Sequence, residues 1–411
     1  MQDATYIWIT LVLGAFLTGA NMVAVLVARR SAERLFLAMG IISFTASVWS
    51  FALLTESYAR IDAVLYAVVF AVAGAVGGYS LASTLLGVLA RHPASLGPIG
   101  ALPEDTGAAA LVILGDDEPA HYQERSTARA LEHLSDEGLL HASIAVLPFL
   151  FMAQKARYRA VGGTSGSARQ LETLAEYVES STDATTFGTV DTASLHGPRD
   201  LETATRSAAA RGYRRIVVAV ALIGESLELD QEKRSIDALR FSDQGVHVSY
   251  TEVLSNSERV ASLIATRIMA IAGDPTITGA VLVGEGQPET RSKSCRHFDE
   301  QESAFLNRVR MHLMERGLPD SHIRIAWSDW RAPDVTMAAR HLAALGCLRI
   351  VISPSCFPLD SLATSLDLQV ALRQARLDPS VTATTLTGYV NDPAFAEEIR
   401  GRAHQALTVI R

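Results

Sequence analysis

The sequence predicts an α/β protein in which three transmembrane helices precede two similar halves, each built on a parallel sheet, with a cleft between the halves. Three observations support this prediction. Long uncharged stretches occupy the first part of the chain, and they have the length of membrane spans. Beyond them, short apolar runs alternate with amphipathic helical stretches, as is typical of α/β proteins. There, a series of four elements occurs twice in the same order, which indicates an internal duplication.

The length and charge of the chain limit the number of domains and the kinds of protein that it could be. The 411 residues exceed the roughly 250–300 at which a single hydrophobic core stops growing, so more than one domain is expected. Acidic residues outnumber basic ones by 44 to 36, giving a net charge of −8. This balance excludes a nucleic-acid binder, which would carry a basic surplus. Because 49% of the residues are hydrophobic and only 19% are charged, one part of the chain is expected in a membrane.

Residues 1–92 are predicted to form a membrane anchor. Its spans run over about residues 6–28, 35–55 and 63–90, and none of them contains a charged residue. Each reaches the roughly 20 residues needed to cross the hydrocarbon core. A cleaved signal peptide does not fit the first span, because Gln2 and Asp3 stand where a basic segment would be needed.

Arginines in the loop between the first two spans set the predicted orientation. Arg29, Arg30 and Arg34 lie in this loop, and cytoplasmic loops are enriched in such residues. The N-terminus is therefore expected outside and everything after residue 91 in the cytoplasm, with the chain in the inner (cytoplasmic) membrane and the lipid bilayer as its first partner. In the third span Gly74 and Gly78 allow close helix approach, and packing inside the three-helix bundle is favoured over a dimer interface.

The cytoplasmic part is expected to hold a linker over residues 93–106 and two α/β halves, 107–273 and 274–411. The linker is rich in Pro and Gly. Each half opens with an apolar strand that ends in Gly, followed by an acid and by a Pro three residues after the acid; these are Ala109–Pro119 and Gly279–Pro288. A helix is expected after each strand, over about Glu124–Ser135 and Glu300–Arg316.

The first half carries one extra element, residues 139–163. Its apolar run is too short, and too interrupted by Pro148, to be a fourth span. Three interpretations stay open: an apolar lip over the cleft, a membrane-surface contact, and a core helix.

Acidic residues follow the strands of both halves at equivalent positions. Asp116 and Glu285 follow the first strand of each half, and Glu225 and Asp360 lie just beyond the third. In such sheets ligands bind beyond the carboxyl ends of the strands. Carboxylates converging there suit a divalent cation or proton removal from a ring nitrogen. The alternative is that they are ordinary loop acids or helix N-terminal charges.

The motifs of several common enzyme classes are missing from the sequence. No Gly-rich phosphate loop follows a strand, and neither a G-x-S-x-G elbow nor an H-E-x-x-H pair occurs. Nucleotide-dependent and hydrolytic chemistry are therefore not expected.

One segment resembles a known family. Arg157–Ser165 reads RYRAVGGTS, which is similar to the Tyr-Arg-x-Ile-Gly-Gly-Gly-Ser-Pro signature of ferrochelatases. The opening strand, the strand–His–Pro–helix at Leu195–Pro198 and the closing NDPAFAEEI helix follow in the family's order, so the resemblance covers about residues 107–411. It implies Rossmann-like, chelatase-type halves, with a divalent metal and a porphyrin as substrates and no prosthetic group. The wider class includes sirohydrochlorin and cobalt chelatases.

The sequence departs from the family at its two main active-site positions. Glu285 stands where the family has His, and Ala363 stands where it has Glu, although Phe357 and Asp360 match the second motif. The resemblance implies that Glu285 acts as base and metal ligand, with His196 as a second catalytic residue and ligand. The residues that would frame the macrocycle are Tyr158, Arg159, Gly162, Gly163, Ser165 and Phe357. Further cleft acids would be Asp116, Glu225 and Asp360.

Three functions stay open at this point. The first is a membrane-anchored, ferrochelatase-like enzyme of haem and tetrapyrrole metabolism that inserts Fe²⁺ or a similar metal into a porphyrin. The second is a catalytically degenerate homologue that binds or carries a tetrapyrrole, or scaffolds a membrane complex. The third is an unrelated sensor domain of periplasmic-binding type. Whether the chain is an enzyme, and whether it forms a homodimer or joins a membrane complex, is left open.

Overall fold

The computed structural model describes residues 2–57, 61–90, 102–136, 139–197, 199–289, 291 and 295–409. The chain forms two compact units. The first contains Met1–Leu96 and His121–Thr164, and the second contains Gly97–Ala120 and Ser165–Arg411. Residues 93–101 of the predicted linker lie outside the described residues. The predicted fold class is confirmed, since two parallel sheets follow three long apolar helices.

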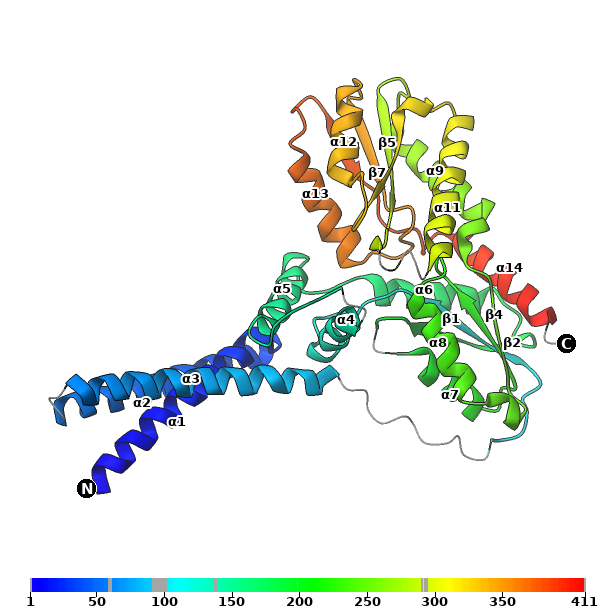
Figure 1. The fold of residues 1–411 in the computed structure, drawn as a ribbon. Helices are drawn as coiled ribbons and strands as arrows, with labels where there is room; N and C mark the ends of the chain where they lie inside the picture. The colour runs from blue at the N-terminus through cyan, green and yellow to red at the C-terminus, as the bar shows by residue number, and fades with distance from the viewer. Residues whose placement is uncertain are drawn as a thin grey trace. The chain divides into compact units, whose positions relative to one another are not determined.

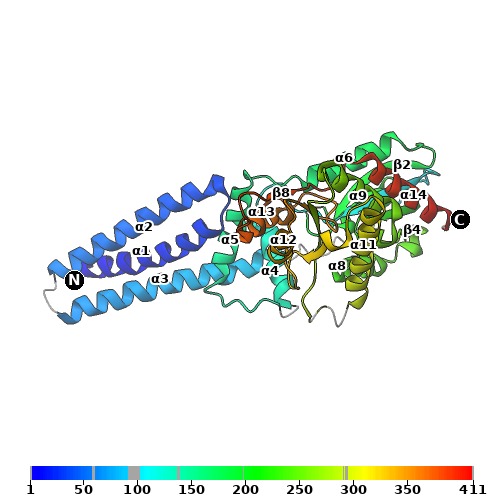
Figure 2. The same cartoon turned by 90° about the horizontal axis from the view of Figure 1, so that it is seen from above.

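Three long helices open the first unit: α1 (Gln2–Val27), α2 (Arg30–Ser57) and α3 (Ile61–Ala90). α1 packs against both α2 and α3, and the three helices run side by side in Figure 2. The stretches Thr5–Val27, Arg30–Glu56 and Ile61–Gly87 are long and apolar enough to cross a membrane. Large apolar side chains are exposed along all three helices, as expected of helices that face lipid rather than water.

Glycines allow α1 to approach both neighbouring helices closely. A Cβ on Gly14 would lie 2.9 Å from the Ser43 backbone oxygen of α2. A Cβ on Gly74 would lie 2.8 Å from the Val12 oxygen of α1, and one on Gly78 would collide with the Phe16 oxygen. The prediction that Gly74 and Gly78 pack inside the bundle is therefore confirmed.

The segment His121–Thr164 belongs to the first unit and contains α4 (Glu124–Asp136) and α5 (Leu147–Ala160). α4 packs on α3, and α5 packs on α1. One side of α5 is buried at Phe151 and Tyr158, whereas Phe149 and Met152 are exposed. The segment therefore combines a packed face with an exposed apolar face.

Side chains from this segment complete the C-terminal end of α1. Lys155 Nζ donates to the backbone oxygens of Val25 (2.7 Å) and Ala28 (3.2 Å). The Tyr122 hydroxyl donates to the Val27 oxygen at 2.6 Å. These bonds satisfy carbonyls that the end of a helix leaves without intrahelical partners. Burial lowers the pKa of Lys155, and the Glu33 carboxylate opposes this.

The second unit holds two four-stranded parallel sheets with the same topology. The first has the order β2-β1-β3-β4 and the second β6-β5-β7-β8. Their strands are β1 (Ala109–Gly115), β2 (Phe187–Ser194), β3 (Arg215–Val220), β4 (His247–Tyr250), β5 (Thr278–Gly284), β6 (Ile323–Trp327), β7 (Arg349–Ser353) and β8 (Thr382–Thr385). The equal order of strands confirms the internal repeat read from the sequence.

The helices of the second unit cover both faces of each sheet. They are α6 (Ser167–Ser180), α7 (Leu201–Ala210), α8 (Leu227–Ala238), α9 (Glu258–Ala272), α11 (Arg296–Glu315), α12 (Val335–Ala344), α13 (Leu368–Ala375) and α14 (Pro393–Val409). Short 3₁₀ turns occur at Phe241–Gln244, Leu254–Asn256 and Asp320–His322, and a π-helical turn at Ala363–Asp367.

Two of these helices are exchanged between the halves. α9 follows β4 of the first sheet, yet it packs on β5, β7 and α11 of the second half. α14 follows β8 of the second sheet, yet it packs on β3, β4 and α6 of the first (Figure 1). A single hydrophobic core therefore runs through both halves, from Ile113 and Leu174 to Leu282 and Phe305. The boundary expected at residues 273/274 lies inside this common body.

The helices that follow the first strand of each half, α4 and α11, do not occupy equivalent places in the structure. Order along the chain pairs Glu124–Ser135 with Glu300–Arg316, and both segments are helical, as α4 and α11. α4 belongs to the first unit, however, and α6 is the helix that packs on β1 and β2. Both predicted helices are therefore confirmed, but α6 rather than α4 is the counterpart of α11, because His121–Thr164 is inserted between β1 and α6.

Replacing Gly78 by Ala tests the packing of the three apolar helices. The new methyl group would overlap the backbone of α1, so the free energy of unfolding should fall by about 1–3 kcal/mol. Gly77→Ala is the matched control, because a Cβ there meets the Phe16 ring at an ordinary 3.8 Å. Thermal unfolding of the detergent-solubilised chain measures both, and equal stabilities would contradict the close packing.

Candidate functional site

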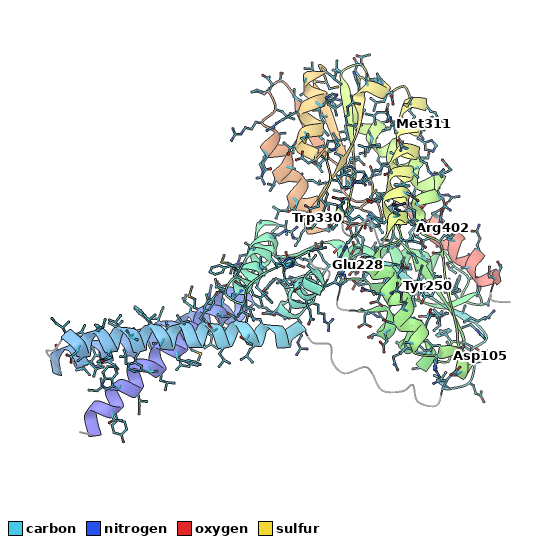
Figure 3. All side chains as sticks on the ribbon, in the orientation of Figure 1. Asp105, Glu228, Tyr250, Met311, Trp330 and Arg402 are labelled. Atoms are coloured by element: carbon cyan, nitrogen blue, oxygen red, sulfur yellow. The ribbon has the colours of Figure 1, made fainter. Side chains whose placement is uncertain are left out.

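The strand-end acids of the two halves interact with one another. Asp116 follows β1 and Glu285 follows β5, and both strands are interior strands of their sheets, fully buried. The charge of Asp116 contributes to raising the pKa of Glu285, so the two carboxyl groups lie within electrostatic reach. Glu228 of α8 acts on both of them, and Figure 3 labels it in the region between the two sheets. The acid that follows the first strand of one half therefore acts electrostatically on its equivalent in the other half.

His196 lies beside the first of these acids. It follows β2, and its Nε2 is 3.7 Å from Asp116 Oδ1. Solvent reaches both side chains, with 49% of His196 and 42% of Asp116 exposed. Because β2 and β1 are neighbours in the sheet, their carboxyl ends present the imidazole and the carboxylate at the same edge.

The surrounding protein favours the protonated forms of both strand-end acids. Burial raises the pKa of Asp116, His196 opposes this, and Glu228 adds to it. Burial also raises the pKa of Glu285 well above its usual value, and the charges of Asp116, Glu302 and Glu228 add to the effect. Exposure of both side chains moderates the size of the shifts. A carboxylate with a raised pKa is a stronger proton acceptor near neutral pH.

Glu302 holds the loop that carries Glu285. This α11 residue is 1% exposed. Its carboxylate accepts hydrogen bonds from the backbone N–H groups of Glu285 (2.9 Å) and Gly286 (3.1 Å). Burial raises the pKa of Glu302, while these bonds oppose the rise. Glu302 therefore positions the Glu285 backbone.

Cys356, which follows β7, lies next to this loop. Its backbone N–H donates to the Val283 oxygen at 3.1 Å, and its thiol bonds to Glu302. Burial and the nearby Glu302 charge raise the pKa of Cys356 well above its usual value, so the thiol stays protonated. Within the described part of the chain, no group of three or more His, Cys, Asp and Glu side chains could hold a metal ion.

Asp117, beside Asp116, is a second acid in this region. It is 5% exposed, and its Oδ1 has no hydrogen-bond partner among the residues the structure describes. Burial raises its pKa to about 6, while a bond to Ser194 opposes the rise.

The other predicted cleft acids have structural partners. Glu225 lies 3.7 Å from Lys233. Asp360 Oδ2 accepts from Gln170 Nε2 at 2.7 Å, and its Oδ1 accepts from the Gly388 N–H at 2.6 Å. Since Gln170 belongs to α6 of the first half, Asp360 joins the two halves.

Phe357 and Ser165 also make contacts inside the second unit. Phe357 is partly buried against the core on the α12 and α13 side of the second sheet. The Ser165 hydroxyl donates to Glu118 Oε1 at 2.7 Å, and the same oxygen accepts from the Leu362 N–H at 2.6 Å. Their roles in substrate binding stay predictions.

The glycines of the signature-like segment terminate α5. Gly162 and Gly163 have φ values of +86° and +90°, a region that favours glycine. The Gly163 N–H donates to the Tyr158 oxygen at 2.7 Å and the Gly162 N–H to the Arg159 oxygen at 3.1 Å, as in a helix C-cap. The termination of helix α5 is therefore sufficient to explain why both positions are glycine.

Tyr158 and Arg159 make their described contacts within the first unit. Tyr158 is 3% exposed, and its ring packs edge-on against Tyr122. Arg159 forms an ion pair with Glu33 of α2. The macrocycle contacts implied by the resemblance stay predictions, and Tyr158 offers almost no free surface. Pro198, named in the strand–His–Pro–helix match, lies outside the described residues.

Sequence reasoning missed Glu302, Asp117 and Glu228. For Glu302 a signal existed: it precedes Phe305 by three positions and Leu306 by four, so it shares their apolar helix face. A carboxylate on such a face needs a buried partner. Asp117 and Glu228 gave no comparable signal, because their surroundings arise from elements distant in the chain.

Comparison with known proteins returns similar folds at low identity. No protein-family model matches the chain, and no curated protein matches it. SirB from Bacillus subtilis with Fe³⁺ is 12% identical, with a TM-score of 0.46, over 73% of this chain and 95% of that one. The sirohydrochlorin chelatase SirB from Bacillus subtilis subspecies spizizenii, in complex with cobalt, has the same identity and coverage, with a TM-score of 0.43.

A third solved structure is larger than the region that matches. DR2241 from Deinococcus radiodurans, a multi-domain protein with structural similarity to chelatases and two additional novel domains, is 17% identical with a TM-score of 0.44. The match covers 72% of this chain and 54% of DR2241, so the chain spans about half of its length.

Replacing Asp117 by Asn tests the raised pKa of this residue. Because its folded-state pKa of about 6 lies above the usual 3.8, folding stability declines as pH rises between these values and stays lower above them. Asp117→Asn should therefore stabilise the protein by up to about 3 kcal/mol at neutral pH and have little effect at about pH 4. Thermal unfolding at both pH values measures this. The exposed Asp243→Asn is the control, and a pH-independent effect would contradict the assignment.

Proposed function

We propose that the chain is a membrane-anchored chelatase-type protein that inserts a divalent metal, Fe²⁺ or a similar ion, into a porphyrin. One observation carries the proposal: Asp116 and Glu285, at the carboxyl ends of equivalent strands, lie within reach of each other, with His196 beside Asp116. The similarity of the 157–165 segment to the ferrochelatase signature supports the substrate class.

The arrangement suits the chemistry of metal insertion. A free-base porphyrin loses two N–H protons as the divalent metal forms bonds to its ring nitrogens, so the site must accept two protons and admit a cation. Glu285 is the proposed proton acceptor, because its raised pKa makes it a stronger base than an ordinary carboxylate. Asp116 and His196 are proposed to accept the second proton and to guide the incoming metal.

A second function is favoured by a different observation. In the described residues no three-ligand metal group exists, and the family's usual His and Glu are replaced by Glu285 and Ala363. A homologue that binds or carries a tetrapyrrole without turnover, or scaffolds a membrane complex, would need neither. An inserting enzyme and a carrier would both bind a tetrapyrrole, whereas a scaffold would not need one.

The anchor is proposed to cross the inner membrane with the N-terminus outside and the second unit in the cytoplasm. Three helices of sufficient length and apolar character support the crossing, and Arg29, Arg30 and Arg34 support the orientation. Porphyrins partition into bilayers, so tethering would raise their local concentration at the site.

Turnover separates the two functions. The purified full chain in detergent is mixed with protoporphyrin or coproporphyrin and with Fe²⁺, Co²⁺ or Zn²⁺, and the metalloporphyrin spectrum is followed. Turnover should fall about 100-fold or more in Glu285→Ala, as on loss of a general base. The control is Glu300→Gln, an exposed acid of α11 (71% exposed). Tight binding without turnover for any metal would leave the carrier, and no porphyrin binding would refute both the inserting enzyme and the carrier and leave only the scaffold.

The pH dependence of turnover tests the role of Glu285 separately. Because the group must be ionised to accept a proton, the rate should rise with pH through an apparent pKa above the usual 4.5. Asp116→Asn removes one charge that raises this pKa, so it should shift the rise to lower pH. A profile unchanged by Asp116→Asn would contradict the coupling of the two acids.

A further inference from the structure

The first unit contains a charged surface pocket that the proposed chemistry does not use. It has a volume of about 470 Å³ and is lined by Arg30, Glu33, Arg34, Leu37 and Arg159. The four α2 residues follow the spacing i, i+3, i+4, i+7, so they share one helix face. Arg159 reaches the pocket from α5. Two helices distant in sequence thus form one site.

The pocket carries more positive charge than its own acid can neutralise. Arg159 forms an ion pair with Glu33, and Lys155 Nζ lies 3.6 Å from the same carboxylate. Arg30 and Arg34 are exposed, and neither has a polar partner among the residues described. Three arginines therefore face one glutamate, and two guanidinium groups remain available to an anion.

The pocket stands at one end of a predicted span. The apolar stretch of α2 begins at Arg30, so the arginines would lie at the depth of lipid headgroups. Leu37 lies about 10 Å beyond Arg30 and about 5 Å beyond Arg34 along α2, and its side chain is 51% exposed. One pocket therefore offers cations at the membrane surface and an apolar side chain below them.

The segment that precedes Arg159 also exposes large apolar side chains, in the same unit of the protein as the pocket. Ile144, Val146, Phe149 and Met152 are large and exposed. The Tyr79 hydroxyl of α3 donates to the Ala145 oxygen at 2.6 Å, and Tyr79 lies inside the third span. This bond holds the exposed apolar residues at the depth of the spans, so they are suited to contact acyl chains.

We propose that the pocket binds the phosphate group of an anionic phospholipid. Arg30 and Arg34 donate to its phosphate oxygens, since a guanidinium matches phosphate with paired donors, and Leu37 contacts the adjoining acyl chain. Basic pockets between membrane helices are suited to such headgroups. The inference rests on the proposed membrane crossing and is independent of metal insertion.

Lipid retention tests the proposal. The full chain is reconstituted in vesicles of equal parts phosphatidylcholine and phosphatidylglycerol, extracted in mild detergent, and its retained lipids are counted by native mass spectrometry. The wild type should retain phosphatidylglycerol preferentially. Arg30→Ala/Arg34→Ala should weaken that retention by about 10-fold or more. The matched control is Arg125→Ala, an exposed arginine of the same unit outside the pocket. Unchanged retention in the double variant would overturn the proposal.

Two further measurements complete the test. One distinguishes loss of positive charge from loss of folding, and the other distinguishes phospholipid from free phosphate. Arg30→Lys/Arg34→Lys keeps the charge and should retain phosphatidylglycerol at an intermediate level, and an unchanged thermal unfolding midpoint in both double variants shows that they fold. Inorganic phosphate is added to the detergent-solubilised wild type and compared with phosphatidylglycerol by thermal shift. Equal stabilisation by the two would identify a small-anion site and overturn the lipid proposal.

Flotation of the wild type with phosphatidylcholine vesicles distinguishes the two proposals. Failure to float would refute the membrane crossing and the lipid site together. Flotation without any preference for phosphatidylglycerol would refute the lipid site alone.

Discussion

The hydrophobic core common to both sheets is the constraint on which the second unit depends. Side chains of β1 and β5 enter the same core, together with helices that each half contributes to the other. Acids that directly follow these two strands then have little freedom to separate, and Asp116 and Glu285 are held within one electrostatic field. Burial in this body is the main cause of the raised pKa values of both acids, and the charge of Asp116 adds to the rise at Glu285.

The sequence was sufficient for features that depend on neighbours along the chain. Strand positions followed from apolar runs, and the equivalence of Asp116 and Glu285 followed from the repeat. Features that depend on distant partners escaped it: Glu302 bonds to a loop at Glu285 that it meets only after folding, and α4 has a helical pattern that does not reveal which body it joins. Gly162 and Gly163 show a pattern with two explanations, because a helix C-cap and the family signature both require glycine at these positions.

The first unit meets a different requirement, because the long apolar helix α1 ends next to polar backbone and side chains. Lys155 enters an apolar setting as a donor to backbone oxygens at the end of α1, and it keeps Glu33 nearby as a counter-charge. Arg159 uses the same carboxylate. Because Glu33 already pairs with Lys155 and Arg159, it leaves Arg30 and Arg34 on the same helix face without a polar partner among the residues described. The charge surplus of the pocket is thus a consequence of how the helix end is satisfied.

The exchange of α9 and α14 determines when each half can finish folding. During synthesis all four strands of the first sheet emerge before any strand of the second. The face of the first sheet that α14 covers nevertheless stays uncovered until β8 has been made, since α14 is translated after it. A ribosome-bound intermediate would therefore hold a half-covered first sheet, and chaperone demand should be greatest while the second half is being translated.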